Sequence, residues 1–305
     1  TTRRGARFSV GGTVRIDFVQ ANAARASDFF LANTDGDLKQ KETNFSAAFS
    51  AGYRVSEYVS LSAGIGRAVR TPLTLERYSD RFPSTKFQTS AEFLGNPAIK
   101  PEASLEFNIG GTVNFRQMRL EADLFVRSID DYITIVADPS VPRRLPLSPP
   151  TVFRYINGTK ANFFGFDLKA ARSFGKYIDG RASLSYVRAE DKFLNEPVIG
   201  IPPMQGIVGL RFHSFIENMY IDLSGEFADE QTRIAVSRFE RRTPGYAIFD
   251  IRGGYRFTKF ASVNAGLKNI GDRFYANHLN SLNPFTGRRV PEIGRNFRVG
   301  LELFF

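Results

Sequence analysis

Apolar and polar residues alternate along most of the chain. Between residues 8 and 18, Phe8, Val10, Val14, Ile16 and Phe18 all fall at even positions, and the odd positions hold polar residues or glycine. Successive side chains of a β-strand point to opposite faces, so this alternation predicts strands with one apolar face. We find no convincing amphipathic helix. The alternation predicts about twelve strands, over residues 7–19, 44–55, 58–69, 103–116, 118–132, 161–173, 179–190, 204–213, 218–228, 246–257, 260–269 and 295–305.

The lengths of the strands and of their connections predict where the strands lie. Many of the strands reach ten residues or more, and a tilted strand of ~9–11 residues crosses a bilayer. Short turns alternate strictly with long segments, which are residues 20–43, 70–102, 133–160, 189–203, 229–245 and 270–294. Outer-membrane barrels have this layout, with short periplasmic turns and longer extracellular loops. We therefore expect an all-β fold, an antiparallel transmembrane β-barrel with its apolar face toward lipid and its polar face toward the lumen.

Composition excludes several classes of protein and site. The chain has 305 residues, no cysteine, two histidines and a net charge of +10. The absence of cysteine rules out a disulfide scaffold and a zinc–thiolate site, and two histidines are too few for a three-histidine metal site. The longest apolar runs, such as residues 133–137, are too short for a membrane helix. The chain begins with Thr1 rather than Met, which leads us to expect a segment upstream.

Several segments resemble TonB-dependent outer-membrane receptors. Residues 95–102, Gly-Asn-Pro-Ala-Ile-Lys-Pro-Glu, are similar to that family's Gly-Asn-Pro-x-Leu-Lys-Pro-Glu stretch between a loop and a strand. The resemblance continues from Arg7 to Phe305, in the order typical of the family. Its further segments are residues 62–72, 75–78, 124–133, 243–250, 268–275 and 294–297, with Phe305 as the terminal aromatic residue.

The resemblance implies an architecture and a function. The family barrel has about 22 strands and a plugged lumen, so residues 1–305 look like one barrel domain with its plug and first strands missing. The implied parent resides in the outer membrane of a Gram-negative cell. It would import a scarce nutrient, with a ferric siderophore or another metal chelate as the default, powered by the TonB complex through the missing N-terminal region. Cobalamin, haem, a free transition metal and a carbohydrate stay open. The alternative is a complete twelve-strand passive channel.

The resemblance also implies two lipid-side partners. Lipopolysaccharide and outer-membrane lipid would surround the barrel. The barrel assembly machinery would read the alternating last strand as an assembly signal, carried by Phe297, Val299, Leu301, Leu303 and Phe305.

Arginine and aromatic residues gather in the long loops and are candidates for ligand binding. Together they can hold an anionic, catechol-rich or planar chelate through charge-assisted hydrogen bonds and cation–π contacts. The plainer interpretation is that they contact lipopolysaccharide phosphates or solvate the loops. The candidates are Arg143, Arg144, Tyr155, Arg238, Arg241, Arg242, Tyr275, His278, Arg288 and Arg289.

Other chemistry is poorly supported by the sequence. An enzyme such as a phospholipase would need more than the adjacent His213 and Ser214, which fall in a short turn. Met118 in a turn and Met219 on the lipid-facing pattern do not make a copper site, and for His278 a surface or hydrogen-bonding role is favoured over metal ligation. We expect no catalytic residue, no metal site, no cofactor and no nucleic-acid partner.

Overall fold

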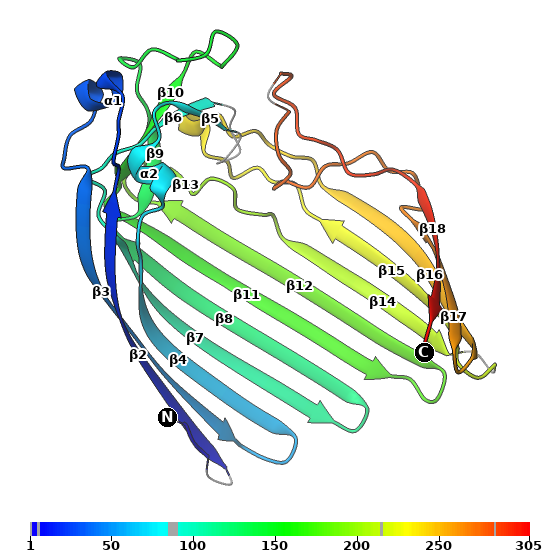
Figure 1. Ribbon diagram of the computed structural model, residues 1–305. Helices are drawn as coiled ribbons and strands as arrows, with labels where there is room; N and C mark the ends of the chain where they lie inside the picture. The colour runs from blue at the N-terminus through cyan, green and yellow to red at the C-terminus, as the bar shows by residue number, and fades with distance from the viewer. Residues whose placement is uncertain (1, 5–6, 85–90, 214–215, 284) are drawn as a thin grey trace.

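Twelve long strands form a curved wall, as the alternation predicts (Figure 1). The computed structural model describes residues 2–4, 7–84, 91–213, 216–283 and 285–305. Every predicted strand is present, with ends that differ by a few residues. The wall consists of β2 (Phe8–Asn22), β3 (Lys39–Arg54), β4 (Val59–Arg70), β7 (Glu102–Phe115), β8 (Met118–Asp130), β11 (Lys160–Ser173), β12 (Ile178–Asp191), β14 (Gln205–His213), β15 (Met219–Ala228), β16 (Tyr246–Thr258), β17 (Ala261–Lys268) and β18 (Asn296–Leu303).

The wall is an open antiparallel meander. Consecutive wall strands pair with one another, and β1 (Thr2–Arg4) and β13 (Glu196–Pro197) complete a 14-stranded sheet. The sheet begins at β1 and ends at β18, and within the described residues these two edges do not pair. The alternative of a closed twelve-strand channel is therefore not what the structure shows. Long connections emerge at one end of the wall, the loop end, and short turns at the other, the turn end (Figure 1).

Strand register places apolar residues beside apolar residues on the outward face. Phe49 lies opposite Gly12 on β2 and Ile65 on β4, and Leu223 lies between Leu210 and Ile251. These side chains have no protein layer over them, and Phe18 remains 81% exposed. A one-residue slip would move a whole strand's apolar set to the other face, so this pattern fixes the register.

The last strand carries the residues of the expected assembly signal. Phe297, Val299, Leu301 and Leu303 all lie on the outward face of β18 and are exposed. Phe305 follows the end of the strand and is also exposed. Their recognition by the assembly machinery stays a prediction.

Two strands extend further toward the loop end than the sequence predicts. Gln20 pairs with Lys41 and Asn22 with Lys39, which lengthens β2 and β3 into the expected loop 20–43. Here residues 39–43 of β3 are polar on both faces, and the apolar residues of β2, Val19 and Ala21, lie on the face opposite to Phe18. The alternation is interrupted at this point, so hydrophobic periodicity could not detect the extension.

The long loops carry structure of their own, which we call the loop cap, made of the described residues between wall strands at the loop end. Its second sheet has the order β5-β6-β10-β9, with β10 parallel to β6. The members are β5 (Phe82–Ser84), β6 (Ala91–Leu94), β9 (Ile133–Ala137) and β10 (Val152–Asn157). Phe93, Ile135, Phe153 and Tyr155 pack into the largest buried apolar cluster. Much of the protein core therefore lies in the cap, above the wall.

Three short helices complete the cap. Ser27 caps α1 (Asp28–Asn33), where its hydroxyl accepts a hydrogen bond from the Phe30 amide at 3.1 Å. The others are α2 (Thr74–Tyr78) and the 3-10 helix η2 (Val236–Arg238). They are too short to produce a helical period, so hydrophobic periodicity could not predict them. No helix in the described part of the chain is long and apolar enough to cross a membrane.

Candidate functional site

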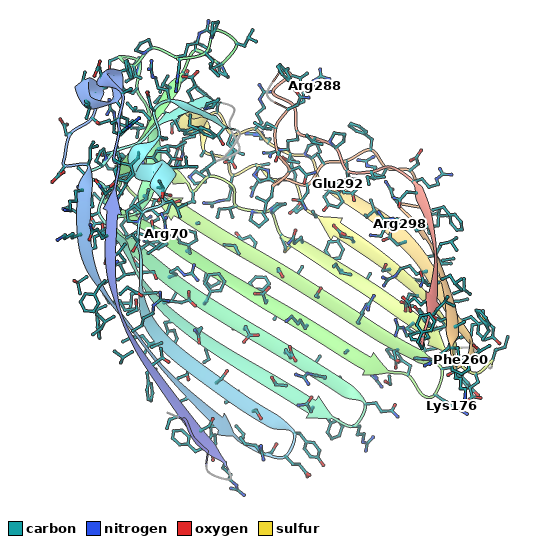
Figure 2. The ribbon with its side chains drawn as sticks, in the orientation of Figure 1. Arg70, Lys176, Phe260, Arg288, Glu292 and Arg298 are labelled. Atoms are coloured by element: carbon teal, nitrogen blue, oxygen red, sulfur yellow. The ribbon has the colours of Figure 1, made fainter. Side chains whose placement is uncertain are left out.

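Two loops of the cap bring arginine residues together, one from residues 229–245 and one from residues 269–295. Arg289 Nη2 donates to the carbonyl oxygen of Arg241 at 3.3 Å. Gly287 has a φ of +61°, and a Cβ there would lie 3.3 Å from Arg241 Nη2. The positive φ and the close guanidinium both favour glycine at this turn. Figure 2 shows Arg288 at the end of its loop.

Three arginine side chains of these loops are exposed and have no acidic partner within the described part of the chain. Arg241, Arg242 and Arg288 are exposed, and among the described residues none of them pairs with a carboxylate. Phe239 and Phe285 belong to the same two loops and are 52% and 87% exposed, and the Phe239 ring also contacts Phe153 edge-on at 5.7 Å. Exposed guanidinium groups and exposed aromatic rings in the same loops suit a ligand that is both anionic and planar. We call these five residues the arginine surface.

Arg289 and His278 lie beneath this surface in a buried network. His278 is 2% exposed, and its Nδ1 and Nε2 lie 2.8 Å from Thr243 Oγ1 and 3.0 Å from Glu240 Oε1. Arg289 Nε donates to Thr243 Oγ1 at 3.0 Å, and burial lowers the pKa of Arg289. Both ring nitrogens of His278 are thus occupied within the protein, as a hydrogen-bonding histidine requires.

Glu240 anchors the same network from below. Burial alone would raise the pKa of its carboxyl group, but hydrogen bonds from His278 and from the amides of Ala235 and Gly200 hold that pKa below its ordinary value. Gly200 comes from residues 192–204, so one carboxylate ties three loops together. No group of three His, Asp or Glu residues suited to a metal ion occurs in the part of the chain that the structure describes.

Arg238 is buried, unlike its neighbours in sequence. It is 0% exposed, and its guanidinium lies 3.3 Å from Asp191 and 3.0 Å from Glu196. It also donates to Thr134 Oγ1 at 2.8 Å and to the Pro197 carbonyl at 3.0 Å. A charge held this way fixes the loops and is not available to a ligand, so we leave Arg238 out of the arginine surface.

The candidates in residues 133–160 divide in the same way. Tyr155 lies in the core against Phe93, with ring centroids 6.0 Å apart, so it too is left out. Arg143 and Arg144 are exposed in a proline-rich loop, where Arg143 Nη1 donates to the Ser148 carbonyl at 2.5 Å. Glu92, a fully buried carboxylate, accepts hydrogen bonds from the backbone amides of Arg144 and Leu145.

Tyr275 lies at the base of the last loop and is half-buried. Its ring is 4.3 Å from that of Tyr246. Burial raises the pKa of its hydroxyl to about 12, with further contributions from Glu226, Glu292 and Asp250. The structure therefore places Tyr275 against Tyr246 of β16, and we leave it out of the arginine surface.

Sequence reasoning missed the acidic residues that organise the cap. Glu92, Asp191 and Glu240 are all buried, and each accepts hydrogen bonds from loop backbone or side chains. Only Glu92 carried a signal, because a single acidic residue inside the apolar run 91–94 indicates a buried carboxylate with partners.

The inward face of the wall is polar and carries ion pairs between strands. Arg211 contacts Asp222 through two hydrogen bonds of 2.7 and 2.9 Å, and Arg252 approaches the same carboxylate at 3.5 Å. At the turn end, His213 Nε2 lies 2.7 Å from Asp179 Oδ2, and Ser214 lies outside the described residues. No catalytic arrangement emerges from these contacts.

Comparison with known proteins agrees with the fold. Residues 3–270 match the family model described as TonB dependent receptor-like, beta-barrel. The copper transporter OprC superposes with a TM-score of 0.84 at 22% identity, over 99% of this chain and 46% of that protein. The FrpB iron transporter from Neisseria meningitidis gives 0.72 at 17% identity, over 99% and 44%. The siderophore receptor PirA from Acinetobacter baumannii gives 0.67 at 15%, over 100% and 53%.

These matches define the family and the extent of the likeness. The chain spans about half the length of the solved structures it resembles. A search of curated proteins gave no match. The family model covers most of the chain, and the open antiparallel wall has the fold of the transporters it superposes on. The chain belongs to the TonB-dependent receptor-like β-barrel family.

Proposed function

We propose that this chain forms part of an outer-membrane receptor that captures a metal chelate, with a ferric siderophore as its cargo. The observation that carries the proposal is the arginine surface, where Arg241, Arg242 and Arg288 are exposed and unpaired with acid among the described residues. Guanidinium groups bind carboxylate and catecholate oxygens through charge-assisted hydrogen bonds. Phe239 and Phe285, exposed in the same two loops, add aromatic contact area.

The orientation follows from the two ends of the wall. In outer-membrane barrels the longer loops face the outside and the short turns face the periplasm. The loop cap would then receive the chelate from the medium, and the turn end would face the periplasm. The net charge of +10 favours an anionic ligand over a cationic one.

Release of the cargo would depend on parts beyond this chain. A plug domain would occupy the lumen, where the polar inward face carries pairs such as Arg211–Asp222 and Arg127–Glu106. The TonB complex would act on a region outside residues 1–305 and supply the energy for transport. The wall would lie in the outer membrane of a Gram-negative cell, next to lipopolysaccharide.

The test compares ligand binding by matched variants of the native-length protein. Replacing Arg241, Arg242 and Arg288 together with glutamine should weaken binding of a ferric catecholate siderophore at least tenfold, because three charge-assisted contacts are lost. Replacing exposed Arg25, in another loop, should change nothing. If the triple variant binds and imports ferric chelates as the wild type does, the proposed ligand contact is wrong.

The second exposed pair provides an independent arm of the same experiment. Arg143 and Arg144 lie in a different loop from the arginine surface. Their double glutamine variant should affect binding less than the triple variant, since Arg143 already donates to Ser148. A larger loss in the double variant would move the contact surface to residues 133–160.

A further inference from the structure

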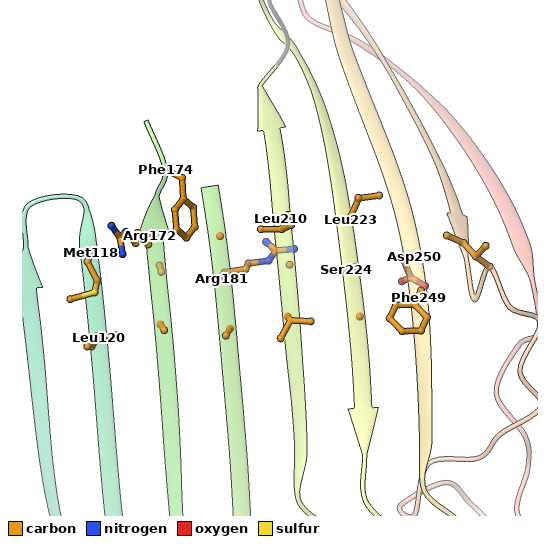
Figure 3. A pocket seen from close by; sticks show the side chains of 18 residues that line it. Met118, Leu120, Arg172, Phe174, Arg181, Leu210, Leu223, Ser224, Phe249 and Asp250 are labelled. Atoms are coloured by element: carbon orange, nitrogen blue, oxygen red, sulfur yellow. The ribbon is translucent and has the colours of Figure 1, made fainter. Parts of the chain in front are cut away.

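The outward face of the wall contains an apolar groove that no proposed role of the loop cap uses (Figure 3). Its volume is 680 Å³, and it crosses β8, β11, β12, β14, β15 and β16. Register shows its course, because Ala170 pairs with Ala182, Ala182 with Val208, and Val208 with Gly225. Short outward side chains at these positions hollow the wall.

Larger side chains form the rims of the groove. The Phe174 ring covers Gly180, where a Cβ would lie 2.8 Å from Phe174 Cε2, and Leu210 lies beside them. Met118 closes the groove at the turn end, and Phe249 bounds it on β16. Figure 3 shows these side chains rising from successive strands around the hollow.

Arg172 lies at the turn end of the groove. Arg172 pairs in register with Met118 and with Gly180, which puts it on the outward face. It is exposed and stacks on Phe174 at 5.1 Å, and no carboxylate in the described part of the chain pairs with it. Lys176 follows in the turn between β11 and β12 (Figure 2). A guanidinium at the membrane edge suits the phosphate of a lipid headgroup.

The dimensions of the groove match one leaflet of a bilayer. From Arg172 on β11 to Phe249 on β16 the groove crosses five strands, whose four spacings of ~4.8 Å make about 19 Å. Barrel strands tilt by about 45°, so this part of the groove rises about 14 Å along the membrane normal. Half of the ~30 Å hydrocarbon core is about 15 Å. An acyl chain in the groove, with its phosphate at Arg172, would therefore span the leaflet on the turn side.

We propose that this groove is a binding site for one phospholipid of the periplasmic leaflet, held by its acyl chain along Ala170, Ala182 and Gly225 and by its phosphate at Arg172. The site rests on the proposed membrane location of the wall and is independent of the ligand bound by the loop cap. Arg172 is an exposed cation beside an apolar groove. A phospholipid can fill the groove and pair its phosphate with Arg172, whereas an apolar protein segment would leave the charge of Arg172 unpaired.

The experiment titrates the purified native-length protein in detergent with phosphatidylglycerol and counts bound lipids by native mass spectrometry. The wild type should retain one lipid in preference to others. Ala182→Phe fills the groove and should weaken that binding about tenfold, as should Arg172→Gln, which removes one charge-assisted contact. Ala63→Phe makes the same substitution on the outward face of β4, outside the groove, and should bind as the wild type does.

Diacylglycerol, which lacks the phosphate, separates the two halves of the site. Arg172→Gln should leave its binding unchanged, whereas Ala182→Phe should weaken it. If Ala182→Phe and Ala63→Phe retain phosphatidylglycerol equally well, the proposal is overturned. It is also overturned if the wild type binds several lipids with no single lipid held more tightly than the others. Arg172→Gln changes only an exposed side chain, so the test still decides if Ala182→Phe fails to assemble. Recovery of the wild type in the outer-membrane fraction checks the location separately from the site.

Discussion

Replacing the buried Arg238 with methionine should loosen the loop cap while leaving the wall intact. The guanidinium joins three loops, through Thr134, through Asp191 and Glu196, and through its own position in η2. Methionine fills a similar volume, so the main loss is charge and hydrogen bonding. The substitution leaves Asp191, which is 0% exposed, without its cation.

The free-energy cost of the substitution depends on which hydrogen bonds remain after the guanidinium is removed. Breaking a buried ion pair by removing one partner costs about 3–5 kcal/mol. Asp191 retains hydrogen bonds from the amides of Phe193 and Leu194, at 3.0 and 3.2 Å, which lowers the cost. Arg238 Nε is buried and has no hydrogen-bond partner among the described residues, so its removal also relieves an existing penalty. We therefore expect the free energy of local opening of these loops to fall by the lower end of this range, about 3 kcal/mol, which corresponds to roughly a 150-fold larger equilibrium constant for opening.

Hydrogen exchange measures this opening directly. Amides in residues 192–204 and 229–245 should exchange faster in Arg238→Met, and amides of β11 and β12 should not change. Arg241→Met, three positions away and exposed, should alter exchange by less than a factor of about two. Asp191→Asn combined with Arg238→Met should recover part of the loss, because the uncompensated charge is gone. If Arg238→Met and Arg241→Met exchange alike, the buried pair does not hold the loops.

Three further results are expected. The pKa of Glu240 is lower in the folded protein than in the unfolded chain, so its carboxylate stabilises the loops above the ordinary carboxyl pKa, and this stabilisation is lost as pH falls below that pKa. The protection of the loop amides, measured relative to their intrinsic exchange rates at each pH, should fall between about pH 5 and about pH 3 and should hardly change in Glu240→Gln. Gly165→Val should reduce the amount of assembled barrel recovered in membrane fractions, because a Cβ at this position would lie 2.5 Å from the Phe125 ring. The control is Ala171→Val on the same strand, which should be tolerated because Ala171 is exposed. Phe305→Ser should slow assembly without changing exchange in the finished wall; an unaltered assembly rate would remove Phe305 from the signal.

The strands of the wall could be predicted from the sequence because their pattern depends only on residues close together in the chain. The alternation of apolar and polar residues has a period of two, and the apolar outward face repeats it in every strand. The rule of alternation failed at the loop end of β2 and β3, where residues 39–43 are polar on both faces and Val19 and Ala21 lie on the face opposite to Phe18. It also could not show that the sheet remains open, which depends on pairing between distant edges.

The cap was not predictable by the same means. The parallel pairing of β6 with β10 joins residues about sixty positions apart, and Arg238 meets Thr134 across 104 positions. Arg238, Arg241 and Arg242 look equivalent in the sequence, yet one is fully buried and two are exposed. What separates them is the pair of acidic residues, Asp191 and Glu196, supplied by another loop.

This separation of buried from exposed arginines has a consequence for how such a receptor can change its ligand. Arg238 and Glu240 hold residues 229–245 in place from beneath, while Arg241 and Arg242, next in the chain, reach solvent. Exposed substitutions cost the fold little, usually within about 0.5 kcal/mol, whereas the buried pair costs several times more. The contact residues can therefore vary while the loop keeps its conformation. Ligand specificity in this cap should follow its exposed positions, and loop stability should follow its buried ones.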